Sequence, residues 1–515
     1  MLEPSRHFLL HAAINDASIS QSIGLTEYSY YFVLKDFVPV LERMGEVHVV
    51  KDPGAEVDAL YRDITDAGGK AVFLNFTAPH NLVPEIQCPT VHVFAWEFDT
   101  LPTDSWLADG LQDWRFALGA HARAITHSQY AKNAIEDAMG PDFPVAVVPC
   151  PVWDKFALQR ERFAQRGPLK DVDLHFEGRV FDTRQIELFV DLDSHHLRRS
   201  REAAGEEIVP AEGGDISPGG LLKKLAHGLT PPLIWRFLER RLAWARSTPT
   251  EEKDNPTPQA PSQAEIDIYT DKKPNALKLE GVVYTSIFNP LDGRKNWRDM
   301  ISAFVWAHKD NKDATLVLKT PNLDVHDFID PLISFLKAFL PFDCRIVVLK
   351  AYLKDGQYES LLEGTSYYVN TSFGEGQCLP LMEYLSAGVP AIAPDSTALA
   401  DYINPEMAFV VPSHAEPSTW QHDPRLSYRA LRYRVDWLKL VEAFKRSYEV
   451  AHQDPSEWRR MGQAAMDRMS QHCSLAVAEA ELAAFFATED PAGAVIDERG
   501  SGSANAVSAT DVQEG

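Results

Sequence analysis

Two glutamates, Glu375 and Glu383, are separated by seven residues in a glycine-containing run that joins a predicted strand to a predicted helix. The strand is the β-prone stretch 366–370, and Gly374 and Gly376 allow the backbone to turn tightly after it. The free N–H groups at the start of a helix favour an anion such as phosphate. Carboxylates instead accept hydrogen bonds from the sugar hydroxyls that flank a phosphate. The combination predicts a binding site for a nucleotide-activated sugar.

The run 371–390 resembles the donor motif of the retaining GT-B glycosyltransferases, particularly the large family 4, which usually reads S-x-x-E-G-F-G-L-P-x-x-E-A-x-x-x-G-x-P. Gln377 and Cys378 depart from this pattern, because phenylalanine and glycine are common at their positions. The residues that keep the pattern are Ser372, Glu375, Gly376, Leu379, Pro380, Glu383, Gly388 and Pro390.

The resemblance implies different roles for the parts of this run. Glu383 accepts hydrogen bonds from the ribose hydroxyls, and Glu375 contacts the hydroxyls of the donor sugar. Residues 376–379 present backbone N–H groups to the phosphates or the sugar. A carboxylate at the start of a helix also offsets the helix dipole, and for Glu383 this structural role is compatible with binding. The residues expected to bind the donor here are Glu383, Gly374, Gly376, Gln377, Cys378 and Leu379.

Strand-like and helix-like stretches alternate in two regions of the chain, which predicts an α/β fold with parallel sheets covered on both faces. The expected strands are 7–14, 46–50, 71–75, 90–95, 124–127 and 145–148 in the first region, and 282–286, 315–319, 345–349 and 366–370 in the second. Helices are expected over 30–43, 296–308 and 379–387. Pro39 is expected to kink the first of these helices or to split it in two.

The resemblance implies the GT-B arrangement, in which two Rossmann-like domains face a cleft. The first domain, 1–155, would lie on the acceptor side, and the second, 280–450, would bind the nucleotide sugar. The remaining segments are an insertion over 156–279, C-terminal helices over 451–487 and a disordered tail over 488–515.

The insertion contains a stretch, 221–246, with six Lys or Arg residues against one Glu. One interpretation is an amphipathic helix that lies in the plane of an anionic membrane, and the other is a helix packed on a neighbouring domain. Asp191 and Asp193 also lie in the insertion, and no metal site is expected from them. The other predicted parts of the insertion are a β-hairpin, 171–181 with 185–190, and a flexible linker, 247–262.

A fixed cation beside a departing diphosphate stabilises the negative charge that develops as the sugar leaves. Lys295 lies just after the first strand of the second domain, where the GT-B resemblance places a lysine followed by glycine or asparagine. Pro290 occupies the position of the arginine that usually precedes this lysine, and Arg294 is its neighbour instead. Lys295 is therefore a catalytic candidate, and Arg294 either reaches the donor phosphates or points to solvent.

Loops of the first domain are candidates because ligands of α/β proteins bind at the carboxyl ends of parallel strands. Glu97 and Asp99 follow such a strand, and they either orient the acceptor hydroxyl, act as a base, or are ordinary loop acids. Trp96 either stacks on a sugar ring or fills the core. Gly24, after the first strand, either approaches the donor phosphates or forms an ordinary turn. Two further residues are expected to be structural, His92 in the core and Ser128 as a helix cap.

The net charge of −24 over 515 residues argues against nucleic acid as a general partner, since phosphate backbones attract basic surfaces. No apolar run reaches about eighteen residues, so no membrane-spanning helix is expected. The first residues lack a signal-peptide pattern. Five scattered cysteines form neither a metal-binding spacing nor a disulfide framework, which favours a reducing cytoplasm.

These observations predict a cytoplasmic glycosyltransferase that uses a nucleotide-sugar donor, a glycan or lipid-linked acceptor, and neither metal nor cofactor. The resemblance implies retention of the anomeric configuration. A bacterial polysaccharide or glycolipid pathway fits a large transferase of this kind, with peripheral membrane contact if 221–246 binds lipid. Two alternatives stay open. One is another GT-B enzyme, such as a nucleotide-sugar epimerase or a phosphorylase, and the other is a non-catalytic protein that binds sugar or acts as a scaffold.

Overall fold

The computed structural model describes residues 5–14, 28–83, 85–103, 112–184, 274–321, 325–420, 423 and 425–488. Nearly all of them belong to one compact unit, which comprises residues 1–182 and 272–515. Gly24, the Asp191 and Asp193 pair, the stretch 221–246 and the tail from residue 489 lie outside the described residues. Among the helices that are described, none combines the length and apolarity needed to cross a bilayer.

Six parallel strands form the sheet of the first domain in the order β2-β1-β3-β4-β5-β6. On one face of β1, Phe8 and Leu10 belong to the same hydrophobic cluster as Phe37 of α2. On the other face, Leu9 clusters with Ile64 of α3. The strand is thus apolar on both sides, as a parallel sheet covered by helices on both faces requires. The elements are β1 (Arg6–Ala12), α2 (Tyr28–Met44), β2 (Glu46–Val49), α3 (Pro53–Asp66), β3 (Lys70–Phe76), η1 (Pro79–Asn81), β4 (Thr90–Phe94), α4 (Trp114–His121), β5 (Ala124–Thr126), α5 (Gln129–Met139) and β6 (Val145–Val147).

The second sheet has the order β15-β14-β13-β10-β11-β12-β8, and all its pairs are parallel except β8 with β12. Tyr284 of β10 is fully buried, and its ring contacts Phe304 of α11 and Phe444 of α15. The strands are β8 (Arg179–Asp182), β10 (Val282–Ile287), β11 (Ala314–Thr320), β12 (Arg345–Lys350), β13 (Tyr367–Val369), β14 (Ala391–Ala393) and β15 (Ala408–Val410). The helices are α11 (Trp297–His308), α12 (Val325–Lys337), α13 (Asp355–Glu363), α14 (Leu379–Ser386), α15 (Trp437–Gln453) and α16 (Pro455–Cys473), with the short turns η3 (Gly293–Lys295) and η4 (Thr397–Asp401).

These two sheets confirm the predicted α/β fold class. Each strand expected in the two domains is present, with bounds that differ from the prediction by one or two residues. The helix expected over 30–43 is α2, and it continues across Pro39 as one helix. The predicted alternative of two helices is therefore wrong, because the surrounding apolar face keeps this segment packed on the sheet.

Part of the predicted insertion belongs to the second domain. The stretch expected as one hairpin strand is interrupted at Gly178, where a Cβ atom would lie 2.6 Å from Lys350 O. Before this glycine, β7 (Val172–Glu177) pairs with β9 (Pro274–Leu279) in a separate antiparallel sheet. After it, β8 joins the edge of the second sheet. The residues 185–190, expected as the other hairpin strand, lie outside the described part of the chain.

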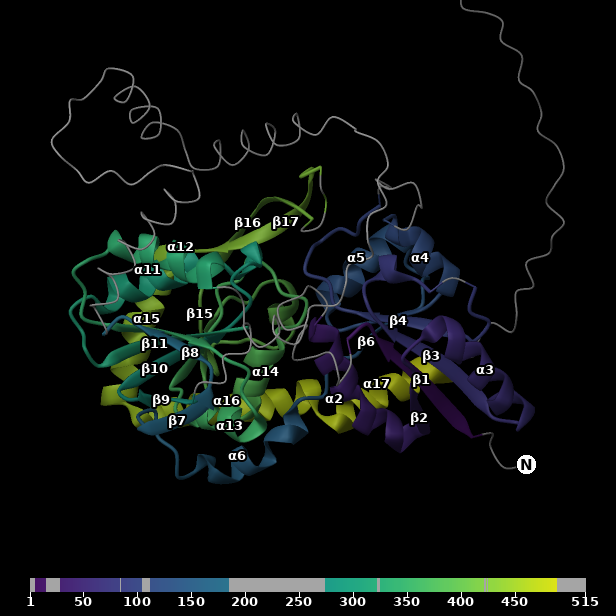
Figure 1. Ribbon diagram of the computed structural model, residues 1–515, viewed down its shortest axis with the longest axis horizontal. Helices are drawn as coiled ribbons and strands as arrows, with labels where there is room; N and C mark the ends of the chain where they lie inside the picture. The colour runs from purple at the N-terminus through teal and green to yellow at the C-terminus, as the bar shows by residue number, and fades with distance from the viewer. Residues whose placement is uncertain are drawn as a thin grey trace, which may run out of the picture. The chain divides into compact units, whose positions relative to one another are not determined.

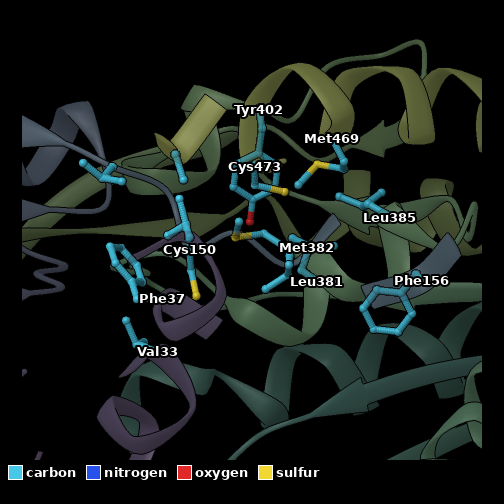
Figure 2. Packing of buried hydrophobic residues seen from close by; sticks show 14 of the residues in the cluster. Val33, Phe37, Cys150, Phe156, Leu381, Met382, Leu385, Tyr402, Met469 and Cys473 are labelled. Carbon is cyan, nitrogen blue, oxygen red and sulfur yellow. The ribbon is translucent and has the colours of Figure 1, made fainter. Parts of the chain in front are cut away.

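One hydrophobic cluster joins residues from both domains. Figure 2 shows Val33 and Phe37 of α2 near Cys150, and Leu381 and Met382 of α14 in the same packed region. The C-terminal helix α17 (Leu475–Ala487), yellow in Figure 1, returns to the first domain and contacts α2 and β6. The interdomain turn η2 (Trp153–Phe156) and the following α6 (Ala157–Phe163) complete the described helices. The two sheets therefore share a core that brings their loops together.

Candidate active site

A pocket of about 160 Å³ lies where loops of both domains meet. The loops that follow β4 and β10 both lead into it, and this edge of a parallel sheet is where ligands commonly bind. The pocket is also lined by a hairpin formed by β16 (Ser413–Thr419) and β17 (Tyr428–Val435). The lining residues are Glu97, Phe98, Gly293, Arg294, Phe373, Gly374, Ser418, Thr419 and Arg432. Three of the predicted site residues, Glu97, Arg294 and Gly374, are thus brought together.

Glu375 is a buried carboxylate beside this pocket, in the loop between β13 and α14. Lys295 donates to both of its oxygens at 2.8 Å. Ser372 Oγ and Asn370 Nδ2 donate to Oε1 at 2.6 and 3.1 Å. Burial by itself would raise the pKa of this carboxyl group, but the charges of Lys295 and Arg294 and the hydrogen bonds lower the pKa of Glu375 to about 2. Glu375 is therefore ionised and held in one orientation.

Arg294 is enclosed by oxygen atoms at the wall of the pocket. Its Nε lies 3.0 Å from Glu97 Oε1, and its Nη2 lies 2.7 Å from Asp292 Oδ2. Its Nη1 donates to the carbonyl of Gly374 at 2.9 Å. Burial opposes the charged form, but the neighbouring carboxylates outweigh it and raise the pKa of Arg294. Of the two predicted alternatives, the one in which Arg294 points to solvent is not observed, since its side chain is 20% exposed and lines the pocket.

Gly374 and Gly376 permit the loop before α14 to approach the first domain closely. A Cβ atom at Gly374 would lie 2.9 Å from Glu97 O, and one at Gly376 would lie 2.9 Å from Ala95 Cβ. Neither glycine has a positive φ, and the left-handed residue in this loop is Cys378, with a φ of 65°. Besides the predicted turn, these glycines therefore make room for the neighbouring backbone.

Glu97 is the carboxyl group that the first domain contributes to the pocket. Its side chain is 14% exposed and pairs with Arg294 across the boundary between the domains. Burial raises the pKa of Glu97, and the charge of Arg294 opposes this rise. Glu97 is therefore a buried carboxyl group whose charge is balanced by Arg294 at the wall of the pocket.

Asp99 and Trp96 have structural partners. Asp99 Oδ1 accepts a hydrogen bond from Leu431 N of β17 at 2.7 Å, and Asp99 is not among the residues that line the described pocket. Trp96 is 7% exposed, and its ring lies 4.4 Å from that of Trp114. Of the two predicted roles for Trp96, the core role is therefore the one observed. Asp99 therefore anchors the hairpin through the backbone of β17.

Of the two departures from the donor motif, Gln377 is buried and Cys378 is partly buried. Gln377 Oε1 accepts a hydrogen bond from the backbone N–H of Cys150, in the first domain, at 2.9 Å. The Nε2 atom of Gln377 is buried and has no hydrogen-bond partner in the described part of the chain. Asn370 Nδ2 donates to Cys378 Sγ at 3.2 Å, and burial raises the pKa of this thiol to about 12. Leu379, expected to offer its N–H group, is the first residue of α14.

Glu383 lies in the second turn of α14 and not in the first, so the predicted contribution to the helix dipole at the first turn is wrong. Tyr358 OH donates to Glu383 Oε2 at 2.5 Å, and Lys155 Nζ lies 3.4 Å from Oε1. Lys155 also donates to Asp36 of α2 at 2.9 Å. Glu383 is therefore held from both domains, by Tyr358 of the second domain and by Lys155, which follows the first sheet.

Lys319 was not predicted, and it lies at the carboxyl end of β11 near Glu383. Burial lowers the pKa of Lys319 to about 8, although the charge of Glu383 opposes this fall. Within the described residues, its amine forms neither a hydrogen bond nor an ion pair. The sequence did contain a signal for Lys319, because it is a lysine at the end of an apolar strand. The carboxyl ends of strands in a parallel sheet lie at the edge where ligands bind.

The β16–β17 hairpin was also missed by the sequence analysis. Thr100 Oγ1 donates to Arg429 O at 2.6 Å, and Trp420 Nε1 donates to Thr100 O at 3.2 Å. Arg432 lies over the ring of Phe373, 4.4 Å from its centroid, and pairs with Glu416. The alternation of residue types over 428–435, after a polar turn, was the signal that could have revealed it.

The two residues expected to be structural have that role. His92 is fully buried, and its Nε2 lies 3.0 Å from His121 Nδ1. Its Nδ1 atom has no hydrogen-bond partner among the described residues, so only one of its two ring nitrogens is hydrogen-bonded there. Ser128 Oγ accepts a hydrogen bond from Ala131 N at 3.2 Å, which confirms the helix cap.

The sequence matches no protein-family model and no curated protein. Similar solved structures include HepE of Anabaena in complex with UDP, with 11% identity and a TM-score of 0.46 over 94% of this chain and 100% of that chain. A glycosyltransferase from Rickettsia africae has 9% identity and a TM-score of 0.47, over 94% of this chain and 98% of that one. Sucrose-phosphate synthase from Thermosynechococcus elongatus has 12% identity and a TM-score of 0.47, over the same shares.

At these TM-scores the likeness carries no functional conclusion. The fold follows from the topology itself, with two parallel sheets whose following loops meet at one pocket. The chain has the two-domain α/β fold, built on two largely parallel sheets, that the sequence predicted.

Proposed function

We propose that the protein is a glycosyltransferase that moves a sugar from a nucleotide-sugar donor to a hydroxyl group of a glycan or lipid-linked acceptor. The observation that carries the proposal is the pairing of Lys295 with Glu375 beside a pocket lined by Arg294 and Glu97. A fixed carboxylate accepts hydrogen bonds from sugar hydroxyls, and a fixed cation attracts a diphosphate. The two chemistries that a nucleotide sugar requires are thus adjacent.

The nucleotide half of the donor would bind at the carboxyl ends of β11 and β13. Glu383 has its carboxylate held by Tyr358 and Lys155, and each carboxylate oxygen can accept more than one hydrogen bond. Ribose hydroxyls would donate to the remaining positions. Lys319 has no ion pair within the described residues, so its amine would supply an additional positive charge for the nucleotide phosphates.

In the chemical step, the bond between the anomeric carbon and the diphosphate oxygen breaks, and a bond to the acceptor oxygen forms. Lys295 would stabilise the departing diphosphate, and Glu375 would hold the sugar during this change. The acceptor would attack on the face from which the diphosphate leaves, so the anomeric configuration is retained. Its proton would pass to the diphosphate, while Glu97 accepts a hydrogen bond from the hydroxyl.

The proposed reaction uses neither a metal ion nor a cofactor, because Lys295 and Arg294 would supply the positive charge at the diphosphate. We place the reaction in bacterial polysaccharide biosynthesis, on the cytoplasmic side of the membrane. This placement extends the resemblance of the motif 371–390, and an acceptor anchored in a lipid would suit it.

The first experiment is a melting-temperature screen with uridine, guanosine, adenosine and thymidine diphosphates, since a ligand that binds the folded state raises the melting temperature. The nucleotide that binds then selects the nucleotide sugars for a hydrolysis assay, with and without a chelator. Lys295→Ala should lose hydrolysis, and the control Lys439→Ala, on the exposed surface of α15, should keep it. If the diphosphates bind and no nucleotide sugar is hydrolysed, the protein is a binder and the catalytic proposal fails. If the chelator abolishes hydrolysis, the metal-free proposal fails.

A further inference from the structure

Two histidines and a glutamate meet at the amino ends of β1 and β2, on the first sheet. The parallel register places His7 opposite Glu46 and Leu9 opposite His48. Glu46 and His48 are two residues apart on β2, so their side chains lie on the same face of the strand. One ligand atom from each of His7, Glu46 and His48 lies within 4.8 Å of the others.

The distances between these atoms suit a single bound ion. His7 Nδ1 lies 3.2 Å from His48 Nε2. His7 Nδ1 lies 3.6 Å from Glu46 Oε2, and His48 Nε2 lies 3.6 Å from Glu46 Oε1. Two nitrogens bound to zinc at about 2.0–2.1 Å in tetrahedral geometry lie roughly 3.3 Å apart, so the two histidine nitrogens already have the spacing that one ion requires.

A neighbouring hydroxyl fixes the orientation of one imidazole ring. Ser5 Oγ lies 3.0 Å from His7 Nε2, on the side of the ring away from His48. When Nδ1 binds a metal, Nε2 carries the proton and can donate it in a hydrogen bond to Ser5. Such partners of the second ring nitrogen are typical of metal-binding histidines, because they select the tautomer and hold the ring.

We propose that His7, Glu46 and His48 bind a divalent transition-metal ion of the zinc class. Two imidazole nitrogens and one carboxylate oxygen suit zinc, copper or nickel, whereas calcium and magnesium prefer oxygen ligands alone. With three protein ligands, the ion keeps a position for water. The ion would tie β2, the edge strand of the sheet, to β1. This site lies at the opposite ends of the strands from the pocket and does not depend on the proposed transferase activity.

The test uses the full-length protein without a histidine tag, after treatment with a chelator and dialysis. Titration calorimetry with Zn²⁺ measures the number of ions bound, and Co²⁺ reports the ligand geometry through its visible absorption bands. We expect wild-type protein to bind one more Zn²⁺ than His48→Ala, or to bind it at least about tenfold more tightly. Zn²⁺ should also raise the melting temperature of wild type more than that of the variant.

Two further variants keep the test decisive. His11→Ala removes an imidazole from the same strand, at its other end, where His11 Nδ1 contacts Val50 O, and it should bind Zn²⁺ as wild type does. Glu46→Gln changes a side chain that is 66% exposed, so it should fold normally and still lose affinity. If wild type binds no Zn²⁺ at micromolar concentration, or if His48→Ala and Glu46→Gln both match wild type, the residues form only a hydrogen-bonded pair with a nearby carboxylate and the proposal is overturned.

Discussion

Replacing Glu375 by glutamine removes one buried charge and leaves the shape of the side chain almost unchanged. Lys295 then faces a neutral amide at the position where it now donates to both carboxylate oxygens. The difference between the ordinary pKa of 4.5 and about 2 in the folded protein corresponds to about 3 kcal/mol of stabilisation. The Glu375 side chain is 6% exposed, so solvent screens little of this energy. We expect Glu375→Gln to lower the free energy of unfolding by about 3 kcal/mol near neutral pH.

The pH dependence of this difference has a definite sign. The folded-state pKa of Glu375 is lower than the unfolded one, so its stabilisation is complete above about pH 4.5 and is lost as the pH falls toward about 2. The difference between wild type and Glu375→Gln should therefore stay constant from about pH 8 to pH 5.5. Below about pH 4.5 it should shrink by about 1.4 kcal/mol for each further pH unit.

Urea titrations followed by tryptophan fluorescence measure this difference, with the midpoint and the slope compared at each pH. Glu442→Gln serves as the control, because this glutamate lies on the exposed surface of α15 and should change stability little. The reasoning is refuted if Glu375→Gln is as stable as wild type near neutral pH, or if the difference between them is unchanged at about pH 3.5.

Three further predictions concern the proposed donor site. Glu383→Ala should weaken binding of the nucleotide diphosphate by about 10- to 100-fold, because the ribose loses a charged acceptor worth roughly 1.5–3 kcal/mol. A dissociation constant that calorimetry finds unchanged would contradict this prediction. Lys295→Ala should lower the turnover number by about two to three orders of magnitude in a protein whose circular dichroism is normal, and wild-type turnover would remove Lys295 from the mechanism. Lys319 has a pKa of about 8, so diphosphate affinity should fall as the pH rises from 7 to 9, and Lys319→Met should lose this dependence. If the affinity of wild type and of Lys319→Met follows the same pH profile, Lys319 does not bind the diphosphate.

Local sequence patterns determined which elements form. The strand expected over 46–50 is β2, and the helix expected over 379–387 is α14, each within one residue of the prediction. Ser128 caps α5 as expected. These features depend on side-chain alternation, helix caps and turn residues within a few positions, so one sequence contains the information they need.

The proximity of two candidate site residues could also be predicted in part. The spacing of Glu375 and Glu383 and the position of Lys295 placed a carboxylate and a lysine in neighbouring loops of one sheet. The observed contact of Lys295 with Glu375 agrees with that placement. The topology of a parallel sheet allows this inference, because the carboxyl ends of its strands lie at the same edge.

Only the tertiary structure decided which groups on different elements meet, both across the two domains and within the first one. Asp99 and Glu97 are two residues apart, yet one holds the hairpin and the other lines the pocket. Position 374 requires a glycine because Glu97 O lies too close for a Cβ atom. His7 lies within hydrogen-bond distance of His48, which is 41 positions away in the sequence. Such contacts depend on how whole elements pack, and the spacing of residues along a chain does not specify the distance between residues on different elements.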